Sequence, residues 1–320
     1  MSALEQVGIM KSLRVILAVA LLVIPSIALL VGAGRVTAGR TADRATATPT
    51  LFIPTISPLI LTPETPVPLN VTVNGLSAGL FVMMPPEVIR NVRVIYEQGL
   101  AAGRNANAFT KLGDSTIEYP YFMTRFDQQG AYNLGDYGYL QATIDQFRGS
   151  FDYNSAAVRR GLRTSMVFDP AWSDARYCRG DEGVLPCELR RKNPIVIFIR
   201  IGSNETATAE YILGNFRRIV EYCIQQGVIP IIGTKADRHE GSDAYNDVMR
   251  QVAKEYSIPL WDFDLLAGTI PGRGLWTDRI HLTNFYAYDW RQPRAFTTGY
   301  GVHDLSALIA LDAVWRAVQQ

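Results

Sequence analysis

The run PIVIFIRIG, residues 194–202, constrains the fold of this chain more than any other feature. It is almost continuously apolar, which is typical of a strand that is buried on both faces in a parallel sheet. Further strand-like segments lie at 107–112, 228–233 and 258–262, and helix-like segments at 86–102, 137–148, 207–226, 243–256 and 304–318. This alternation predicts a doubly wound α/β fold: a three-layer α/β/α sandwich around a mostly parallel sheet.

Three regions are predicted along the chain. Residues 15–31 are almost wholly apolar and follow Lys11 and Arg14, so residues 1–34 indicate an N-terminal signal peptide or membrane anchor. Residues 35–84 are rich in Pro and Thr and are interpreted as a linker or stalk, although their apolar residues would allow part of them to pack on the domain. Residues 85–320 form the predicted catalytic domain. We therefore expect an exported protein, either secreted or anchored to a membrane by an uncleaved N-terminal segment.

The charge balance and the rarity of His and Cys limit the classes of function. There are 31 basic and 30 acidic residues, a net charge of +1, which gives no electrostatic footprint for a nucleic-acid partner. Three His and three Cys, at spacings that fit no zinc pattern, predict no metal site. No glycine-rich phosphate loop is found. The chain is therefore expected to work without a cofactor or metal.

Ser115 follows Gly113-Asp114 directly after the strand expected at 107–112. A serine nucleophile needs a sharp, exposed turn and a base that removes its proton, and the glycine supplies backbone freedom for such a turn. The tripeptide alone is equally compatible with an ordinary turn in which Ser caps a helix, and Pro120 suits the start of that helix.

Asp278 and His281 form an Asp-x-x-His pair in a loop near the C-terminus. A catalytic imidazole needs an acceptor for its Nδ1–H, and an Asp three residues earlier in a tight turn can reach that atom. The alternative is a solvated pair in a surface turn.

Two further positions offer oxyanion donors. Asn204 follows the longest buried strand, where its amide can point toward a developing negative charge. It can equally open the next helix as an Asx turn. Gly161, in the loop RGLRT, can supply a backbone N–H, but alone it is an ordinary loop glycine.

Four motifs have now been described, around Ser115, Gly161, Asn204 and His281. In this order and spacing they resemble the SGNH, or GDSL-type, esterase and lipase hydrolase family across residues 86–320. The resemblance implies a flavodoxin-like sheet. It also implies a catalytic triad of Ser115, His281 and Asp278. The oxyanion hole would consist of the Ser115 and Gly161 backbone N–H groups and the Asn204 side chain.

The chain departs from the family pattern at each block after the first. Glu205 stands where the family usually has Asp, no Asn precedes Gly161 by two positions, and Leu282-Thr283 replaces the common Pro-Asn. An insertion rich in aromatic residues and Arg, residues 284–296, follows. We expect this insertion either to shape the substrate pocket or to cover it.

The three cysteines help to indicate the cellular compartment in which the protein works. Cys178 and Cys187 flank a short polar loop, which in an exported protein suggests a disulfide. Cys223 lies on the apolar face of a predicted helix and is interpreted as a core thiol. Three free thiols in a cytosolic enzyme is the alternative.

The resulting hypothesis is an extracytoplasmic serine esterase acting on carboxylic esters of a small molecule, a glycan or a lipid. Two alternatives stay open. One is an O-acyltransferase that modifies an exopolysaccharide, and the other is a non-catalytic surface binding module with the same fold.

Overall fold

The computed structural model describes residues 71–319. The predicted leader and most of the predicted linker, residues 1–70, lie outside the described part, as does Gln320. Within residues 71–319 no helix has both the length and the apolar character needed to cross a membrane.

The central sheet has five strands in the order β3-β7-β6-β5-β4. Their bounds are β3 Val82–Met83, β4 Asn105–Gly113, β5 Pro194–Arg200, β6 Ile229–Gly233 and β7 Leu260–Trp261. β4, β5, β6 and β7 are mutually parallel, and β3 pairs with β7 in the antiparallel direction. All seven residues of β5 are buried, as its apolar run predicts. The predicted mostly parallel α/β fold is confirmed.

The segment around Val158 completes the topology. It follows β4 in the chain and forms a single parallel bridge with Gly113, on the side of β4 that faces away from β5. Numbered along the chain, the parallel segments are β4, the Val158 segment, β5, β6 and β7. Their spatial order across the sheet is then 2-1-3-4-5. This is the flavodoxin-like order, in which the crevice beside the first strand is the usual ligand site.

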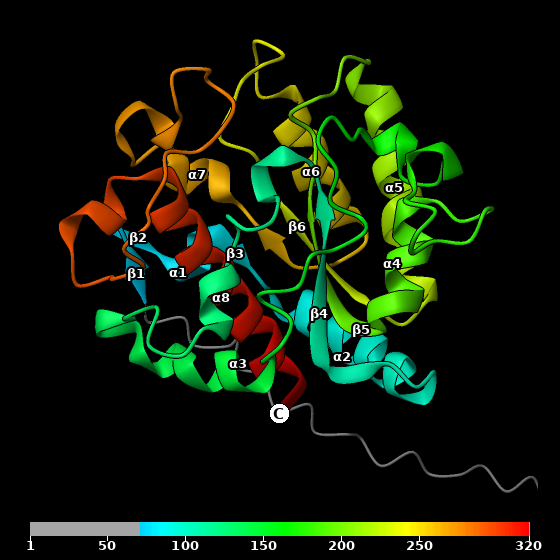
Figure 1. The fold of residues 1–320 in the computed structure, drawn as a ribbon, viewed down its shortest axis with the longest axis horizontal. Coiled ribbons are helices and arrows are strands. Elements are labelled where there is room, and N and C mark those ends of the chain that lie inside the picture. Colours follow the sequence, from blue (N-terminus) through cyan, green and yellow to red (C-terminus); the bar gives the residue numbers. More distant parts are fainter. Residues whose placement is uncertain (1–70, 320) are drawn as a thin grey trace, which may run out of the picture. The chain divides into compact units, whose positions relative to one another are not determined.

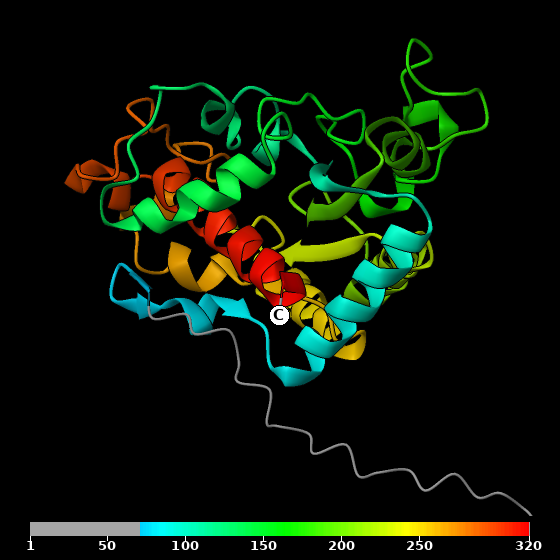
Figure 2. The same cartoon turned by 90° about the horizontal axis from the view of Figure 1, so that it is seen from below.

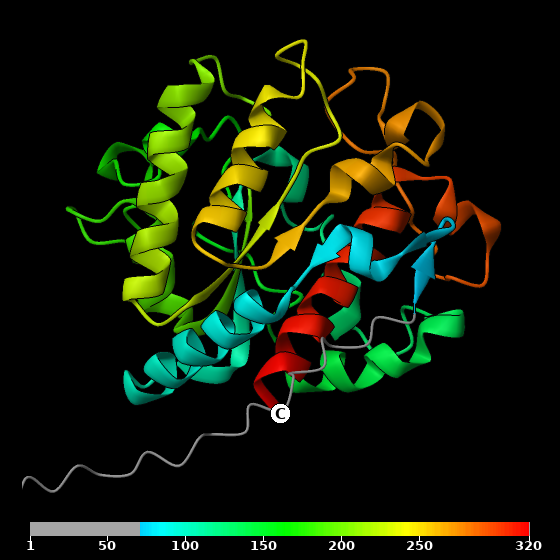
Figure 3. The same ribbon diagram turned by 180° about the vertical axis from the view of Figure 1, so that it is seen from behind.

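Helices cover both faces of the sheet. α3 (Gln141–Gln146) and α8 (Gly299–Gln319) lie on one face (Figure 1), where they run side by side (Figure 2). α2 (Pro86–Ala101), α5 (Ala209–Gln225) and α6 (Ala244–Glu255) lie on the other face (Figure 3). α4 (Val184–Lys192) packs beside β4, and α7 (Phe263–Ala267) follows β7.

α5 shows why these segments are helical. Its buried side chains recur at intervals of three or four residues, which places them on one face; they are Ile212, Phe216, Ile219, Val220 and Cys223. Thr208 caps the helix by accepting a hydrogen bond from the backbone N–H of Tyr211. The apolar face packs on the sheet and fixes the helix there.

Several boundaries differ from the sequence prediction. The helix expected at 137–148 is observed as a 3₁₀ segment, Gly135–Leu140, followed by α3, and Tyr137 within the 3₁₀ segment has non-helical backbone angles. The last helix begins at Gly299, five residues before the predicted start at 304.

The folded unit also begins ahead of residue 85, so part of the stretch interpreted as a linker packs on the domain, as its apolar residues would allow. β1 (Thr72–Val73) and β2 (Leu76–Ser77) form a hairpin, and α1 (Ala78–Phe81) leads into β3. Val73 and Phe81 are fully buried, so burial of apolar side chains holds this stretch on the domain despite its proline-rich surroundings.

Candidate active site

Ser115 lies at the carboxyl end of β4, where the strand turns into a short 3₁₀ segment, Ser115–Ile117. The carboxylate of Asp114 caps that segment by accepting hydrogen bonds from the backbone N–H of Thr116 (2.9 Å) and from its hydroxyl group (2.7 Å). The turn thus leaves Ser115 partly exposed while Asp114 and Thr116 are buried. In this structure Asp114, and not Ser115, is the capping residue. The alternative interpretation of the motif, in which Ser115 caps a helix, is therefore wrong.

Asp278 and His281 lie in a tight loop whose two ends are joined by a hydrogen bond from the Trp276 N–H to the His281 carbonyl (2.7 Å). Arg279 has a φ of +59°, in the left-handed region, and this turns the chain back within three residues. Asp278 then accepts hydrogen bonds from the backbone N–H groups of Ile280 (2.9 Å) and His281 (3.0 Å).

Ser115, His281 and Asp278 form one continuous hydrogen-bonded chain. Ser115 Oγ lies 2.9 Å from His281 Nε2, and His281 Nδ1 lies 2.6 Å from Asp278 Oδ2. Partial desolvation acts to raise the pKa of Asp278, but the hydrogen bonds from Ile280 and His281 outweigh it and lower the pKa to about 2. Asp278 is therefore an anion at neutral pH, which is the state that orients an imidazole and stabilises its protonated form.

Asn204 and Gly161 lie in loops that are hydrogen-bonded to the same strand end. Ser203 donates its backbone N–H to Asp114 (3.3 Å), which places the loop of Asn204 beside the turn of Ser115. Asn204 Nδ2 is buried and has no hydrogen-bond partner among residues 71–319. Arg159 donates its N–H to the Gly113 carbonyl (3.0 Å), which brings the Gly161 loop to the same place.

Backbone geometry requires glycine at two points of these loops. Gly161 has a φ of +77° and Gly202 a φ of +140°, both in regions that disfavour side chains. A Cβ on Gly202 would also lie 2.7 Å from Met249 Cε. The chain leaving β5 can therefore turn toward Asn204 only because residue 202 has no side chain.

Glu205 has a role that the sequence did not reveal. Its carboxylate is buried and accepts a hydrogen bond from the backbone N–H of Thr164 (2.5 Å), three residues beyond Gly161. This bond ties the loop of Asn204 to the loop of Gly161. The departure from the family pattern at this position thus marks a contact between the two candidate oxyanion segments.

A cavity of about 500 Å³ opens over the hydrogen-bonded chain. Besides the three residues of that chain, its lining includes Glu118, Tyr121, Arg160, Trp276, Leu282, Asn284 and Tyr300. The side chain of Glu118 pairs with Arg160 at 2.6 Å across one wall of the cavity. The site is therefore open to solvent and wide enough for a bulky substrate.

The insertion at 284–296 shapes this region. Its residues Phe285, Tyr288 and Trp290 are nearly fully buried, and the Trp290 indole donates to the Gly301 carbonyl (2.9 Å). Together with Tyr121 and Tyr300, the insertion lines a second, aromatic cavity of about 220 Å³ next to the first. Of the two expectations for the insertion, shaping the pocket is the one observed.

The other two histidines lie elsewhere. His303 is fully buried against the rings of Phe122, Trp261 and Phe263, and neither ring nitrogen has a hydrogen-bond partner within the described residues. Burial lowers its pKa well below the usual value. His239 is an exposed loop residue whose backbone N–H bonds to Asp237 (3.3 Å).

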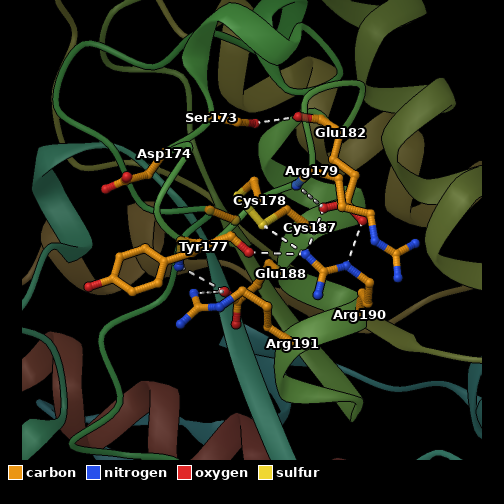
Figure 4. The surroundings of a disulfide bond; sticks show 12 residues. Ser173, Asp174, Tyr177, Cys178, Arg179, Glu182, Cys187, Glu188, Arg190 and Arg191 are labelled. Carbon is orange, nitrogen blue, oxygen red and sulfur yellow. Dashed lines mark hydrogen bonds and ion pairs between the residues drawn. A yellow bond between two sulfur atoms is a disulfide. The ribbon is translucent and has the colours of Figure 1, made fainter.

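Cys178 and Cys187 are joined in a disulfide, and Cys223 is a buried free thiol in α5. The disulfide connects a surface loop to α4 (Figure 4). Burial raises the pKa of the Cys223 thiol to about 12, which keeps it protonated and unreactive.

The fold and the site together define a Ser-His-Asp arrangement at the carboxyl edge of a flavodoxin-like sheet. No family model matches the sequence, and no curated protein matches it. Solved structures do match, and they include esterases and a lipolytic protein of the G-D-S-L family.

Three such structures illustrate the likeness. The psychrotrophic esterase EstA from Pseudoalteromonas sp. is 15% identical, with a TM-score of 0.39 over 67% of this chain and 97% of that chain. A two-domain esterase (CEX) active on acetylated mannans is 15% identical, with a TM-score of 0.43 over 72% of this chain and 57% of that chain. A lipolytic protein of the G-D-S-L family from Desulfitobacterium hafniense is 14% identical, with a TM-score of 0.42 over 64% of this chain and 99% of that chain. At such low identity, residue roles in this chain rest on its own geometry.

Proposed function

We propose that this chain is an extracytoplasmic serine esterase that hydrolyses carboxylic esters, with Ser115 as nucleophile, His281 as general base and Asp278 as the carboxylate that orients His281. The observation that carries the proposal is the continuous hydrogen-bonded chain from Asp278 through both ring nitrogens of His281 to Ser115 Oγ. Because Nδ1 is held by a carboxylate, Nε2 is free to accept the serine proton.

The reaction then proceeds in two halves. Ser115 Oγ attacks the ester carbonyl carbon while its proton moves to His281 Nε2. The tetrahedral intermediate collapses, the bond to the leaving oxygen breaks, and that oxygen takes the proton from Nε2. Water repeats the sequence on the acyl-enzyme: His281 takes a proton from water, hydroxide adds to the acyl carbon, and Ser115 Oγ leaves as it regains the proton.

The negative charge that develops on the carbonyl oxygen needs donors that are already in place. The buried Nδ2 of Asn204 has no hydrogen-bond partner within residues 71–319, so it offers a preorganised donor with nothing to displace. We assign it to the oxyanion hole, together with the backbone N–H groups of Ser115 and Gly161. An unpaired buried amide costs stability in the resting protein, and a role in binding the intermediate accounts for that cost.

The proposal is tested with a fluorophosphonate label and a short nitrophenyl ester. The label should modify Ser115 alone, and Ser115→Ala should abolish both labelling and turnover. His281→Ala should lower kcat by at least about 10³, as expected when a triad member is lost. His239→Ala is the matched control and should keep wild-type turnover. Substantial turnover by the Ser115→Ala protein would refute the mechanism.

The exported location is supported by two features. The sequence has the composition of a leader at residues 15–31, and the structure contains a disulfide, a bond that persists mainly in oxidising compartments. Peptide mapping without reductant, on protein recovered from its host, should find Cys178 and Cys187 linked. Recovery of both as free thiols in the cytosolic fraction would contradict the proposed location.

A further inference from the structure

A second cleft, of about 570 Å³, lies next to the catalytic cavity and shares Glu118 and Arg160 with it. It is rich in arginine and tyrosine; the lining includes Arg159, Arg160, Arg176, Arg191, Tyr119, Tyr153 and Tyr177. Only two carboxylates, Glu118 and Asp174, oppose the four guanidinium groups of the lining. In a chain whose net charge is only +1, this is a local concentration of positive charge.

Two of the four arginines have no carboxylate within hydrogen-bonding distance among the described residues. Arg159 Nη2 lies 3.8 Å from Asp174. Arg191 Nη1 lies 3.8 Å from Glu188. That distance is beyond a hydrogen bond. Arg159 and Arg191 can therefore receive a further anion.

Glu188 cannot serve as a full partner of Arg191, because its carboxylate is already engaged. One of its oxygens accepts a hydrogen bond from the Thr110 hydroxyl, and the other accepts one from the Ala156 N–H (2.7 Å). Burial raises the pKa of Glu188, although the hydrogen bonds from Thr110 and Ala156 act against it. The positive charge of Arg191 is thus left facing the cleft.

Tyrosine rings lie beside these arginines. Tyr177 is 49% exposed, and its ring packs against two guanidinium groups, those of Arg191 (4.4 Å from the centroid) and Arg176 (5.3 Å). The disulfide partner Cys178 is the next residue in the chain, so the disulfide fixes this ring beside α4 (Figure 4). Tyr119, near the catalytic cavity, is 46% exposed. An exposed aromatic face such as that of Tyr119 can stack on the apolar face of a sugar ring, while guanidinium forks bind carboxylates in a bidentate manner.

We propose that this cleft, the arginine–tyrosine cleft, binds a polysaccharide that carries carboxylate groups, such as a chain of uronic acid residues. The bound chain continues past Glu118 and Arg160 and presents an ester on a neighbouring sugar to Ser115. This inference rests on the proposed esterase function for the reaction, but the binding itself does not depend on catalysis.

Binding is measured with the Ser115→Ala protein, so that esters are not consumed. Titration calorimetry with polygalacturonate oligosaccharides is compared with neutral xylan oligosaccharides of equal length. The polyuronate should bind at least about tenfold more tightly at low salt, and the difference should shrink at high salt, as for ion pairs at a solvent-exposed site. Equal affinity for the two glycans would overturn the proposal.

Substitutions distinguish the cleft from general surface charge. Arg159→Gln with Arg191→Gln should weaken polyuronate binding at least about tenfold. The matched control, Arg217→Gln with Arg218→Gln, removes two positive charges from α5, outside the cleft, and includes an arginine that likewise stacks on an aromatic ring, Phe168. An equal loss in both double variants would mean diffuse attraction and would refute a defined site.

Two further measurements distinguish this proposal from the proposed esterase function and from unspecific binding of polyanions. With Ser115 intact, the Arg191→Gln variant should turn over nitrophenyl acetate like the wild type, while its kcat/KM for an acetylated polyuronate falls severalfold. If polyuronate binds as expected but no ester is turned over, the esterase function fails and the cleft stands. If single-stranded DNA binds the cleft as tightly as polyuronate, recognition is of generic polyanions and the glycan proposal is wrong.

Discussion

Replacing both half-cystines with alanine isolates the contribution of the Cys178–Cys187 disulfide to the free energy of unfolding. Both positions are buried, Cys187 fully and Cys178 at 9% exposure, so alanine removes the crosslink without placing a hydroxyl in an apolar setting. The bond closes a short loop with a sequence separation of 9. That loop carries Arg179, Asp181 and Glu182, and the bond anchors the preceding segment with Tyr177.

The magnitude follows from the length of the loop. Closing a loop of this size lowers the entropy of the unfolded chain enough to raise the free energy of unfolding by about 2.6 kcal/mol at 25 °C. For a domain of roughly 250 residues, each kcal/mol shifts Tm by about 2–4 °C, so the double variant should melt about 5–10 °C below the wild type. The salt bridge from Arg190 to Glu182 (2.6 Å) remains in the variant, but as a partly exposed pair it offsets little of this loss.

Thermal unfolding of both proteins under oxidising and reducing conditions measures this effect. The wild type in reductant should approach the double variant, and the double variant should not respond to reductant. Turnover of a short nitrophenyl ester should be unchanged below the melting range, because the loop contributes nothing to the hydrogen-bonded chain at Ser115. A double variant as stable as the wild type would show that loop-closure entropy is not what this bond supplies.

Two predictions concern the catalytic machinery. Because the pKa of Asp278 is about 2, its stabilising pairing is present above about pH 4 and is lost only as the pH falls toward 2. Asp278 should therefore contribute no change in kcat/KM between pH 8 and pH 5, and a two-proton slope in the pH–rate profile over that range would contradict this. Glu205→Gln should lower kcat about tenfold with little change in KM, because the carboxylate that holds the Thr164 N–H loses its charge. An unchanged kcat in steady-state assays would mean that the two loops keep their geometry without this bond.

Much of the fold could be predicted from the sequence because the strands are read from short, uninterrupted apolar runs. β5 and β6 lie within one or two residues of their predicted limits, and α5 and α6 show the expected amphipathic spacing. β3 could not be predicted, because it is two residues long and gains its hydrogen bonds only from β7, far along the chain. The stretch just before it was assigned to the linker because of its composition, whereas Val73 and Phe81 are held by burial in the domain.

The site is predictable where its geometry is local. Asp278 and His281 are three residues apart, so one tight turn brings them together, and the sequence contains all that is needed. Glu205 is different, because its partner is a backbone N–H at residue 164, a contact that only the folded loops create. The arginine–tyrosine cleft was likewise not predicted, since its residues are drawn from four separate segments between 118 and 191.

The contrast between His281 and His303 shows why His281 is the residue proposed as the base. Each has an aspartate close in sequence, and His303 Nδ1 lies 3.6 Å from Asp304. A base must hold a proton during the reaction, and in His303 burial, with the positive charge of Arg200 nearby, drives the pKa well below the usual value. His281 is 45% exposed and bonded to an ionised carboxylate, so its protonated form is solvated and paired. The decisive property is the position of His281 in a solvent-facing loop at the edge of the sheet, because the core position of His303 stabilises only the neutral imidazole.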